Sequence, residues 1–335
     1  MSDISSTAAC GQNELVRISH LKQYFPVSTG FLKTTMLKAV DDVSFTISRG
    51  ETLGLVGESG CGKTTVGRTL LYLYEPTDGE IWFDGKKIGS KESLKEYRRR
   101  AQMVFQDPYS SLNPRKRIAD ILAEPMLYHK LVTPGEVSAR VESLLSSVGL
   151  PKAAAARYPH EFSGGQRQRI TIARALSLNP EVIICDEPVS ALDMSIQAQI
   201  LNLLKDLQEE YGLTYLFIAH GLGAVHYVSA RTAVMYLGKI VEEGPSREVF
   251  VHPAHPYAQM LIGSVPQADP DSPPVKVLSG EVPSAVSLPK GCRFADRCPF
   301  AKPVCFEQEP ELSALPADPA HRVACHLAGQ KGGSV

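Results

Sequence analysis

The chain has 335 residues, of which 43% are hydrophobic and 21% are charged, and its formal net charge is −1. This length predicts two or three domains, because single hydrophobic cores usually stop growing below it. The near-neutral balance creates no field that would attract bulk nucleic acid or an anionic membrane surface, so we expect no nucleic-acid partner and only a local anion site.

The N-terminal twenty residues contain no basic segment followed by an apolar one, so they do not resemble a secretory signal. No later stretch approaches the ~20 uninterrupted apolar residues that a membrane span needs. We therefore expect a cytosolic chain whose thiols are kept reduced.

Residues 39–60 first alternate apolar and polar positions and then become a nearly continuous apolar run. The alternation predicts half-buried antiparallel strands, and the run "TLGLVG" predicts a buried core strand. Asp84-Gly85 in "GEIWFDGKKI" predicts the turn of a further hairpin.

The stretch "GESGCGKTT" follows the buried strand and matches the phosphate-loop pattern G-x-x-x-x-G-K-[ST]. Its glycines let main-chain N–H groups and a helix N-terminus face a phosphate chain. We expect Lys63 to reach the β- and γ-phosphates and Thr64 to ligate Mg²⁺. The predicted phosphate loop comprises Gly57, Glu58, Ser59, Gly60, Cys61, Gly62, Lys63, Thr64 and Thr65.

Residues 108–166 have a helical and loop-like character, which predicts a helical insert in an α/β core. The core resumes with the strand "VIICD", which ends in Asp186 and is followed by Glu187. Open α/β sheets bind ligands at this end of their strands. We expect Asp186 to hold Mg²⁺ through water and Glu187 to act as general base on the attacking water.

Ser163, Gly164, Gly165 and Gln166 precede a long predicted helix. They form a second helix N-terminus that can present a hydroxyl and N–H groups to phosphate. Because the chain already has one phosphate loop, this second site favours the nucleotide of a partner subunit.

With these motifs the chain resembles the ATP-binding subunits of ABC transporters. "FSGGQ" is similar to the family signature, with Phe162 in place of Leu. "SALD", ending in Asp193, resembles the D-loop, Gln106 in "VFQDP" the Q-loop, and His220 the switch histidine. Gly221 follows His220 where the family usually has Asp. The adenine-stacking aromatic of the family corresponds best to Phe25, with Tyr24 as the alternative.

The resemblance implies a P-loop, RecA-like α/β ATPase core with an antiparallel β subdomain. It also implies that two subunits sandwich two ATP molecules with Mg²⁺, for which Thr64, Gln106 and Asp186 are the expected ligands. Lys63, Gln106, Glu187 and His220 are the expected catalytic residues. Since these residues are intact, we expect the site to hydrolyse ATP, but we expect this hydrolysis to be slow in a lone subunit.

Longer segments, such as "QDPYSSLNPRKRI" and "RYPHEFSGGQRQRI", resemble the peptide-importer subfamily. This implies import of dipeptides or oligopeptides at the cytoplasmic face of the bacterial inner membrane. The implied partners are a non-identical ATPase subunit, two transmembrane permease subunits and, indirectly, an extracytoplasmic binding protein. Another small cargo (nickel, glutathione, an oligosaccharide or an opine) stays open, and a soluble ATPase of translation or DNA repair is the more remote alternative.

Cys292, Cys298, Cys305 and Cys325 have the spacing C-x₅-C-x₆-C-x₁₉-C. Four thiolates in a reduced compartment suit a tetrahedral zinc or an iron–sulfur cluster, and the gaps are wider than in typical zinc knuckles. The tail resembles the peptide-importer C-terminal extension, some members of which carry a 4Fe–4S cluster. We therefore expect 4Fe–4S, with zinc or free thiols as alternatives.

The predicted organisation has four parts: 1–107 with the β subdomain and phosphate loop, 108–166 as the helical subdomain ending in the signature, 167–251 as the rest of the core, and 252–335 as a linker and small cysteine-containing extension.

Overall fold

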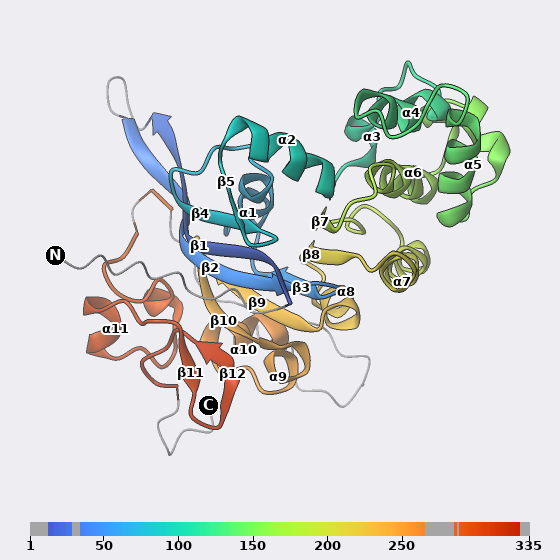
Figure 1. Cartoon of the computed structure of the whole chain (residues 1–335). Coiled ribbons are helices and arrows are strands. Elements are labelled where there is room, and N and C mark those ends of the chain that lie inside the picture. The colour runs from blue at the N-terminus through green and yellow to red at the C-terminus, as the bar shows by residue number, and fades with distance from the viewer. Residues whose placement is uncertain (1–12, 29–33, 265–284, 287, 329–335) are drawn as a thin grey trace.

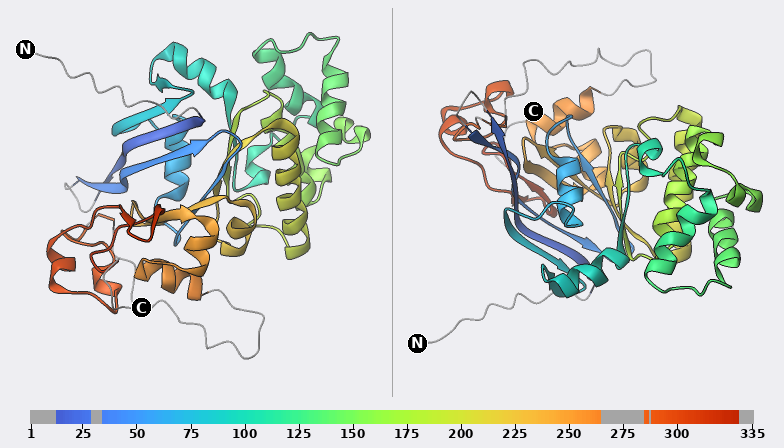
Figure 2. Two further views of the ribbon diagram at one scale, coloured as in Figure 1. Left: turned by 60° about the horizontal axis from the view of Figure 1, so that its bottom comes forward. Right: turned by 90° about the horizontal axis from the view of Figure 1, so that it is seen from above.

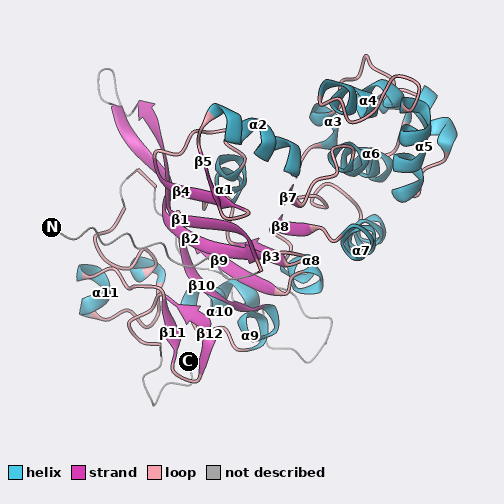
Figure 3. Ribbon diagram, in the orientation of Figure 1, coloured by secondary structure: helices cyan, strands magenta, loops and turns pink. Residues whose placement is uncertain are grey.

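The computed structural model describes residues 13–28, 34–264, 285–286 and 288–328 (Figure 1). The described backbone forms a four-stranded sheet, an eight-stranded sheet and a region made only of helices and loops (Figure 3). Among the helices of these residues, none combines the length and the apolar character required to cross a membrane.

The smaller sheet is antiparallel and has the strand order β2-β1-β4-β5. Asp84 and Gly85 join its last two strands with φ angles of 53° and 72°. Two successive positive φ values match the twist of the strands in a two-residue hairpin, so the predicted turn is confirmed. The strands are β1 (Glu14–Ser28), β2 (Thr34–Ser48), β4 (Asp78–Phe83) and β5 (Lys86–Ile88).

The larger sheet has the order β11-β12-β10-β9-β3-β8-β7-β6. Its parallel strands β3, β7 and β8 are buried at every position, which explains why their sequences are continuous apolar runs rather than alternating ones. The strands are β3 (Thr52–Val56), β6 (Ala101–Val104), β7 (Val182–Asp186), β8 (Thr214–Ile218), β9 (Arg231–Tyr236), β10 (Lys239–Pro245), β11 (Ser313–Leu315) and β12 (Asp318–Val323).

Helix α1 (Lys63–Leu70) contacts strands of both sheets and lies between them (Figure 2). The hydrophobic core is divided by the larger sheet: Val182 and Ile184 of β7 face the smaller sheet, whereas Ile183 and Cys185 face the helices on the other side. This division follows from the period of two along a strand. Val66 and Leu70 of the phosphate-loop helix are thus part of the apolar layer between the two sheets.

The helical region of residues 108–176 begins directly after the loop that carries Gln106 (Figure 1). Its apolar residues, such as Ile121, Leu122 and Leu145, join the core on the helical face of the larger sheet. The predicted helical character is confirmed here. The elements are α3 (Pro108–Ser111), α4 (Ile118–Tyr128), α5 (Val137–Ser147), α6 (Gly164–Leu176) and the 3₁₀ turns Lys152–Ala156 and Pro159–Glu161.

Further helices complete the described chain around the two sheets. They are α2 (Lys91–Arg100), α7 (Met194–Tyr211), α8 (Leu222–Val228), α9 (Ser246–Val251), α10 (Pro256–Gly263), α11 (Pro303–Glu307) and the 3₁₀ turn Ala295–Arg297.

The cysteine-containing extension is joined to the core sheet through one of its strands, β12 (Asp318–Val323). Strand β12 pairs antiparallel with β10 through Glu242↔Val323 and Glu243↔Arg322, so the extension continues the core sheet (Figure 3). This pairing covers an edge strand whose main-chain groups would otherwise be unpaired. Much of the predicted linker, residues 265–284 and 287, lies outside the described residues. The domain boundaries stay predictions.

Candidate nucleotide site and cysteine cluster

The phosphate loop joins β3 to α1 and depends on glycine for close approach. A Cβ on Gly57 would lie 2.1 Å from the carbonyl oxygen of Met235, and one on Gly62 would lie 2.1 Å from that of Ala39. Both glycines have positive φ, 154° and 112°. No side chain caps α1 at Gly62, so the N–H groups of its first turn are left to face an anion.

The ammonium group of Lys63 lies over the loop itself. Its Nζ donates to the carbonyl oxygens of Gly57 at 2.7 Å and Glu58 at 2.9 Å. The side chain is almost fully buried, at 4% exposure. The loop therefore holds one positive charge at its centre.

Thr64 and Asp186 bring the start of α1 to the end of β7. The Thr64 hydroxyl donates to Asp186 Oδ1 at 2.8 Å. The other oxygen, Oδ2, is buried and has no hydrogen-bond partner among the described residues. Burial raises the pKa of Asp186. A buried carboxylate oxygen without a donor fits the hard-oxygen ligation that Mg²⁺ prefers.

Glu187 is held by two of the predicted site residues. Gln106 Nε2 donates to Glu187 Oε2 at 2.7 Å, and Nε2 of His220 contacts the other oxygen, Oε1. Glu187 itself has a positive φ of 49°, a backbone conformation that is unusual for a glutamate. Residues from two other loops thus converge on the Glu187 carboxylate.

Gly221 is the N-cap residue of α8 and has an extended backbone with φ −73°. A Cβ at this position would meet nothing within 4 Å. The fold therefore does not require glycine here, and the departure from the family pattern has no steric reason.

The signature residues begin α6 with a capping box. Gln166 N donates to Ser163 Oγ at 3.3 Å, and Ser163 N donates to Gln166 Oε1 at 3.1 Å. Gly165 allows α6 to approach α7, because a Cβ there would lie 2.5 Å from Ile196. Asp193 caps α7 by accepting from Ile196 N at 3.0 Å. The signature lies in the helical region, whereas the phosphate loop starts α1 between the sheets (Figures 1 and 2).

Tyr24 and Phe25 have different surroundings. The Tyr24 hydroxyl donates to Asp41, and burial and that carboxylate raise the pKa of Tyr24. Phe25 packs edge-on against Tyr74 with ring centroids 5.2 Å apart.

The four tail cysteines line one small enclosed cavity together with His255 and Phe294. Among the described residues, however, no three His, Cys, Asp or Glu side chains are placed closely enough to hold a metal ion. Main-chain N–H groups approach the sulfurs: Lys302 N lies 3.5 Å from Cys305 Sγ, and Leu327 N lies 3.5 Å from Cys325 Sγ.

Burial raises the pKa of Cys292 to about 11 and also raises that of Cys298 and Cys325, and the other thiols add to these shifts. A cation among them would favour the thiolate form of these three. The donor set thus fits a thiolate centre in its chemistry.

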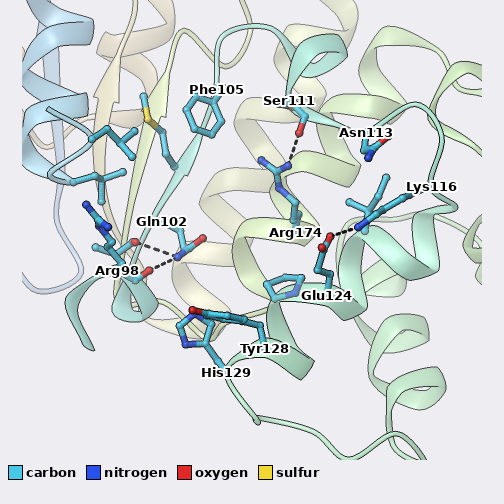
Figure 4. A pocket seen from close by; sticks show the side chains of 16 residues that line it. Arg98, Gln102, Phe105, Ser111, Asn113, Lys116, Glu124, Tyr128, His129 and Arg174 are labelled. Carbon is cyan, nitrogen blue, oxygen red and sulfur yellow. Dashed lines mark hydrogen bonds and ion pairs between the residues drawn. The ribbon is translucent and has the colours of Figure 1, made fainter. Parts of the chain in front are cut away.

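A groove of about 590 Å³ lies between the larger sheet and the helical region, next to the Gln106 loop (Figure 4). Phe105, Met103 and Tyr128 contribute apolar surface, and Lys116 pairs with Glu124 at 2.8 Å on one wall. Arg174 of α6 donates to the Ser111 carbonyl oxygen inside it. Tyr128 lines the groove and is 76% exposed, and its ring packs edge-on against that of His129 with centroids 5.0 Å apart.

Comparison with known proteins places these features in a family. A family model described as "ABC transporter" matches residues 40–190, and one described as "Oligopeptide/dipeptide transporter, C-terminal region" matches residues 241–305. The oligopeptide transport ATP-binding protein AppF of Bacillus subtilis (strain 168) is 53% identical over 327 residues, covering 95% of this chain and 99% of that protein. The chain belongs to the family of ABC transporter ATP-binding subunits.

Two further relatives belong to the same branch of this ABC family. The oligopeptide transport ATP-binding protein OppF of B. subtilis (strain 168) is 53% identical, covering 88% of this chain and 97% of that protein. The dipeptide transport ATP-binding protein DppF of Haemophilus influenzae is 47% identical, covering 87% and 90%. The resemblance to peptide-importer subunits is thereby confirmed.

The fold of this ABC subunit is similar to solved cassettes. The dimeric, post-hydrolysis structure of the ATP-binding cassette MJ0796 bound to ADP and Pi has a TM-score of 0.62 at 28% identity, covering 70% of this chain and 99% of that one. The structure of CbiO1 from Clostridium perfringens gives 0.62 at 27%, covering 72% and 92%. The predicted ABC ATPase fold and enzyme class are confirmed.

Sequence reasoning missed two arginines of this ABC subunit. Arg293 and Arg297 flank cysteines in "GCRFADRC", and both reach the nucleotide-binding core, Arg293 at Asp41 and Arg297 at Glu58. The sequence offers one indication of their importance: Arg293 directly follows Cys292, and Arg297 directly precedes Cys298.

Proposed function

We propose that this chain is the ATP-hydrolysing subunit of an importer for oligopeptides or dipeptides, working at the cytoplasmic face of a bacterial inner membrane. The observation that carries the ATPase role is the convergence of Gln106 and His220 on Glu187, adjacent to Asp186. The peptide cargo is supported by the names of relatives that match along almost the whole chain.

In this proposal the phosphate loop binds the phosphates of ATP. Lys63 would exchange its bonds to the Gly57 and Glu58 carbonyls for phosphate oxygens, since a charged acceptor binds an ammonium more strongly than a neutral one. Ser59, Gly60, Cys61 and Thr65 complete the loop. Phe25 would stack on adenine, because the Tyr24 side chain is fixed by Asp41.

Thr64, Asp186 and Gln106 would hold Mg²⁺, which neutralises phosphate charge when it is bound. The support is the buried, unpartnered Oδ2 of Asp186 next to the Thr64 hydroxyl. Thr64 would then turn its oxygen to the metal instead of donating to Asp186.

Glu187 would accept the proton of the attacking water. Its two oxygens are oriented by Gln106 on one side and His220 on the other, so the carboxylate cannot rotate freely. When ATP binds, His220 would move to the γ-phosphate, which leaves one oxygen of Glu187 free to take the proton.

Ser163, Gly164, Gly165, Gln166 and Asp193 would complete the ATP site of a second, non-identical ATPase subunit. The support is their position at the start of α6 and α7, in the helical region and apart from this chain's own phosphate loop. A lone subunit should hydrolyse ATP slowly, because each site lacks half of its contacts.

The groove next to Gln106 would receive a cytoplasmic helix of one of two transmembrane permease subunits. Three observations favour an amphipathic helix: the apolar lining by Phe105 and Met103, the polar wall formed by Lys116 and Glu124, and the exposed Tyr128 at the rim (Figure 4). A groove beside the Gln106 loop is well placed to couple the ATP site to the membrane.

The four cysteines would hold a 4Fe–4S cluster that cross-links the turns of the extension. The support is their convergence on one cavity and the main-chain N–H groups directed at Cys305 and Cys325, since such donors stabilise thiolate ligands. Iron and sulfide analysis of anaerobically purified protein should give about four irons per chain, lost in Cys298→Ser, whereas one zinc or no metal would contradict the cluster.

The function is tested by reconstitution of the chain with its partner ATPase and the permease subunits in proteoliposomes. We expect ATP hydrolysis that increases when the binding protein is loaded with an oligopeptide, together with uptake of the labelled peptide. Hydrolysis stimulated only by nickel, glutathione or a sugar would overturn the peptide assignment but leave the ATPase assignment intact.

A further inference from the structure

The cysteine-containing extension reaches the phosphate loop directly. Both terminal nitrogens of Arg297 donate to the carboxylate of Glu58, Nη1 to Oε2 at 2.8 Å and Nη2 to Oε1 at 2.9 Å. The Arg297 side chain is only 4% exposed and that of Glu58 only 18%. A two-bond, largely buried fork of this kind fixes the carboxylate in direction as well as in place.

Glu58 is held through its main chain as well. Its N–H donates to the Tyr257 hydroxyl of α10 at 2.8 Å. Tyr257, Tyr236 and Phe294 pack their rings against one another, with centroids between 4.6 Å and 5.4 Å apart. Arg297 lies beside this aromatic group and also donates to the Tyr236 hydroxyl at 3.2 Å. The second residue of the phosphate loop is therefore fixed from two sides.

A second arginine of the same turn anchors the extension to the core. Arg293 donates to Asp41 of β2 and to the carbonyl oxygen of Leu237, in the β9–β10 turn. The next residue of that turn, Gly238, donates its N–H to the Cys61 carbonyl oxygen of the phosphate loop at 2.8 Å. The turn that carries both arginines is thus anchored to β2 and to the β9–β10 turn, which itself contacts the phosphate loop.

A carboxylate in a loop that binds a polyphosphate repels the ligand unless a positive group neutralises its charge. Unit charges of like sign repel strongly at short range in a partly buried site. Arg297 supplies one positive charge to the one negative charge of Glu58, so the pair adds no net charge to the loop. Removing the arginine alone would leave the carboxylate unpaired beside the phosphates.

We propose that Arg297 is a positioning residue for ATP binding: it neutralises Glu58 and fixes the phosphate loop, so that the extension supports the nucleotide site. The inference rests on the proposed role of the loop as the ATP site. It does not depend on whether the cysteines hold a cluster.

The test is a double-mutant cycle on the full chain, with the Kd for ATP measured by equilibrium binding in the presence of Mg²⁺. We expect Arg297→Met to raise the Kd about tenfold, with a smaller change in kcat than in KM. In a Glu58→Gln background the same Arg297→Met change should raise the Kd less than about twofold, because no carboxylate is then left unpaired. Arg297→Lys should fall between, since it keeps the charge but loses the fork.

Arg322→Met is the matched control. Arg322 lies in the same extension, on β12, and pairs with Glu243 rather than with the loop. We expect a wild-type Kd for this variant. Equal loss in both backgrounds, or a wild-type Kd for Arg297→Met, would overturn the inference. A wild-type chain that does not bind ATP would instead overturn the proposed function.

Thermal unfolding and circular dichroism of each variant separate folding from binding. Should Arg297→Met fail to fold, Arg297→Lys still decides the question. A folded lysine variant with unchanged ATP affinity contradicts the proposal, and one with weakened affinity that Glu58→Gln relieves supports it.

Discussion

The nucleotide half-site and the cysteine cluster are built on different supports. Asp186 ends a strand buried on both faces, Glu187 follows it, and the phosphate loop follows another such strand. The cysteines lie on turns and on one short helix, and the neighbouring Arg293 and Arg297 connect these turns to the core. A rigid sheet edge brings catalytic side chains into contact by itself, whereas a set of turns depends on ligands and on tertiary contacts for its geometry.

The strongest test of the nucleotide half-site is Glu187→Gln. We expect kcat for ATP hydrolysis to fall by at least about 100-fold, because glutamine cannot accept the proton of water. The amide keeps the size of the side chain, so the Kd for ATP should stay near that of the wild type. Residual hydrolysis above about a tenth of the wild-type rate would show that another group acts as the base.

The cysteine cluster is expected to have a weaker, indirect effect on the same site. Cys298→Ser should lower the melting temperature and raise the Kd for ATP roughly threefold, since Arg297 is the preceding residue and coupling through such contacts is typically modest. Cys305→Ser is the matched variant, because Cys305 is adjacent in sequence to neither Arg293 nor Arg297. A Kd change in Cys298→Ser but not in Cys305→Ser would show that the local turn, rather than a shared metal centre, is responsible.

His255 links the stability of the extension to pH. Burial lowers the pKa of His255 to about 3, while an exposed imidazole titrates near ~6.5. Between these values the unfolded chain binds one proton more than the folded chain, so the free energy of unfolding should fall as pH drops below about 6.5. The slope from this residue is at most roughly 1.4 kcal/mol per pH unit.

His255→Asn should remove that part of the slope, measured by denaturant unfolding between pH 7 and pH 4.5. Asparagine keeps the N-cap function, in which His255 Nδ1 accepts from Tyr257 N. Glu242 accepts from the main-chain N–H groups of Ala254 and His255 and contacts His321 Nε2. The four cysteines and His326 line the same cavity as His255. If the dependence of the unfolding free energy on pH is unchanged in this variant, another titratable group causes the loss of stability in acid.

The smallest expected effect concerns Gly221. Gly221→Asp restores the family's residue at the N-cap of α8, where a Cβ meets nothing within 4 Å. We expect stabilisation by a few tenths of a kcal/mol and no loss of ATP hydrolysis. A lower melting temperature or a clear loss of kcat would indicate that His220 needs glycine beside it.

Much of the nucleotide site follows from the sequence because its motifs are local. Each one lies at the end of a strand and spans only a few residues, as in "GLVGESGCGKTT" and "VIICDEP". The spacing of the residues therefore largely fixes where their side chains lie. The convergence of Gln106, Glu187 and His220 follows from the strand order of the larger sheet, since all three residues follow neighbouring parallel strands, β6, β7 and β8. The incorporation of the extension into the core sheet was not implied, because β12 pairs with a strand some 80 residues earlier.

By itself the sequence determined the family, the ATPase class and the residues of the phosphate loop, because short-range periodicity and glycine spacing encode them. Only the tertiary structure decided that Arg297 pairs with Glu58 and Arg293 with Asp41. Those pairs join residues 239 and 252 positions apart, and no local rule of strand or helix formation brings together side chains at such separations. The packing of the extension against the core places them within hydrogen-bond distance.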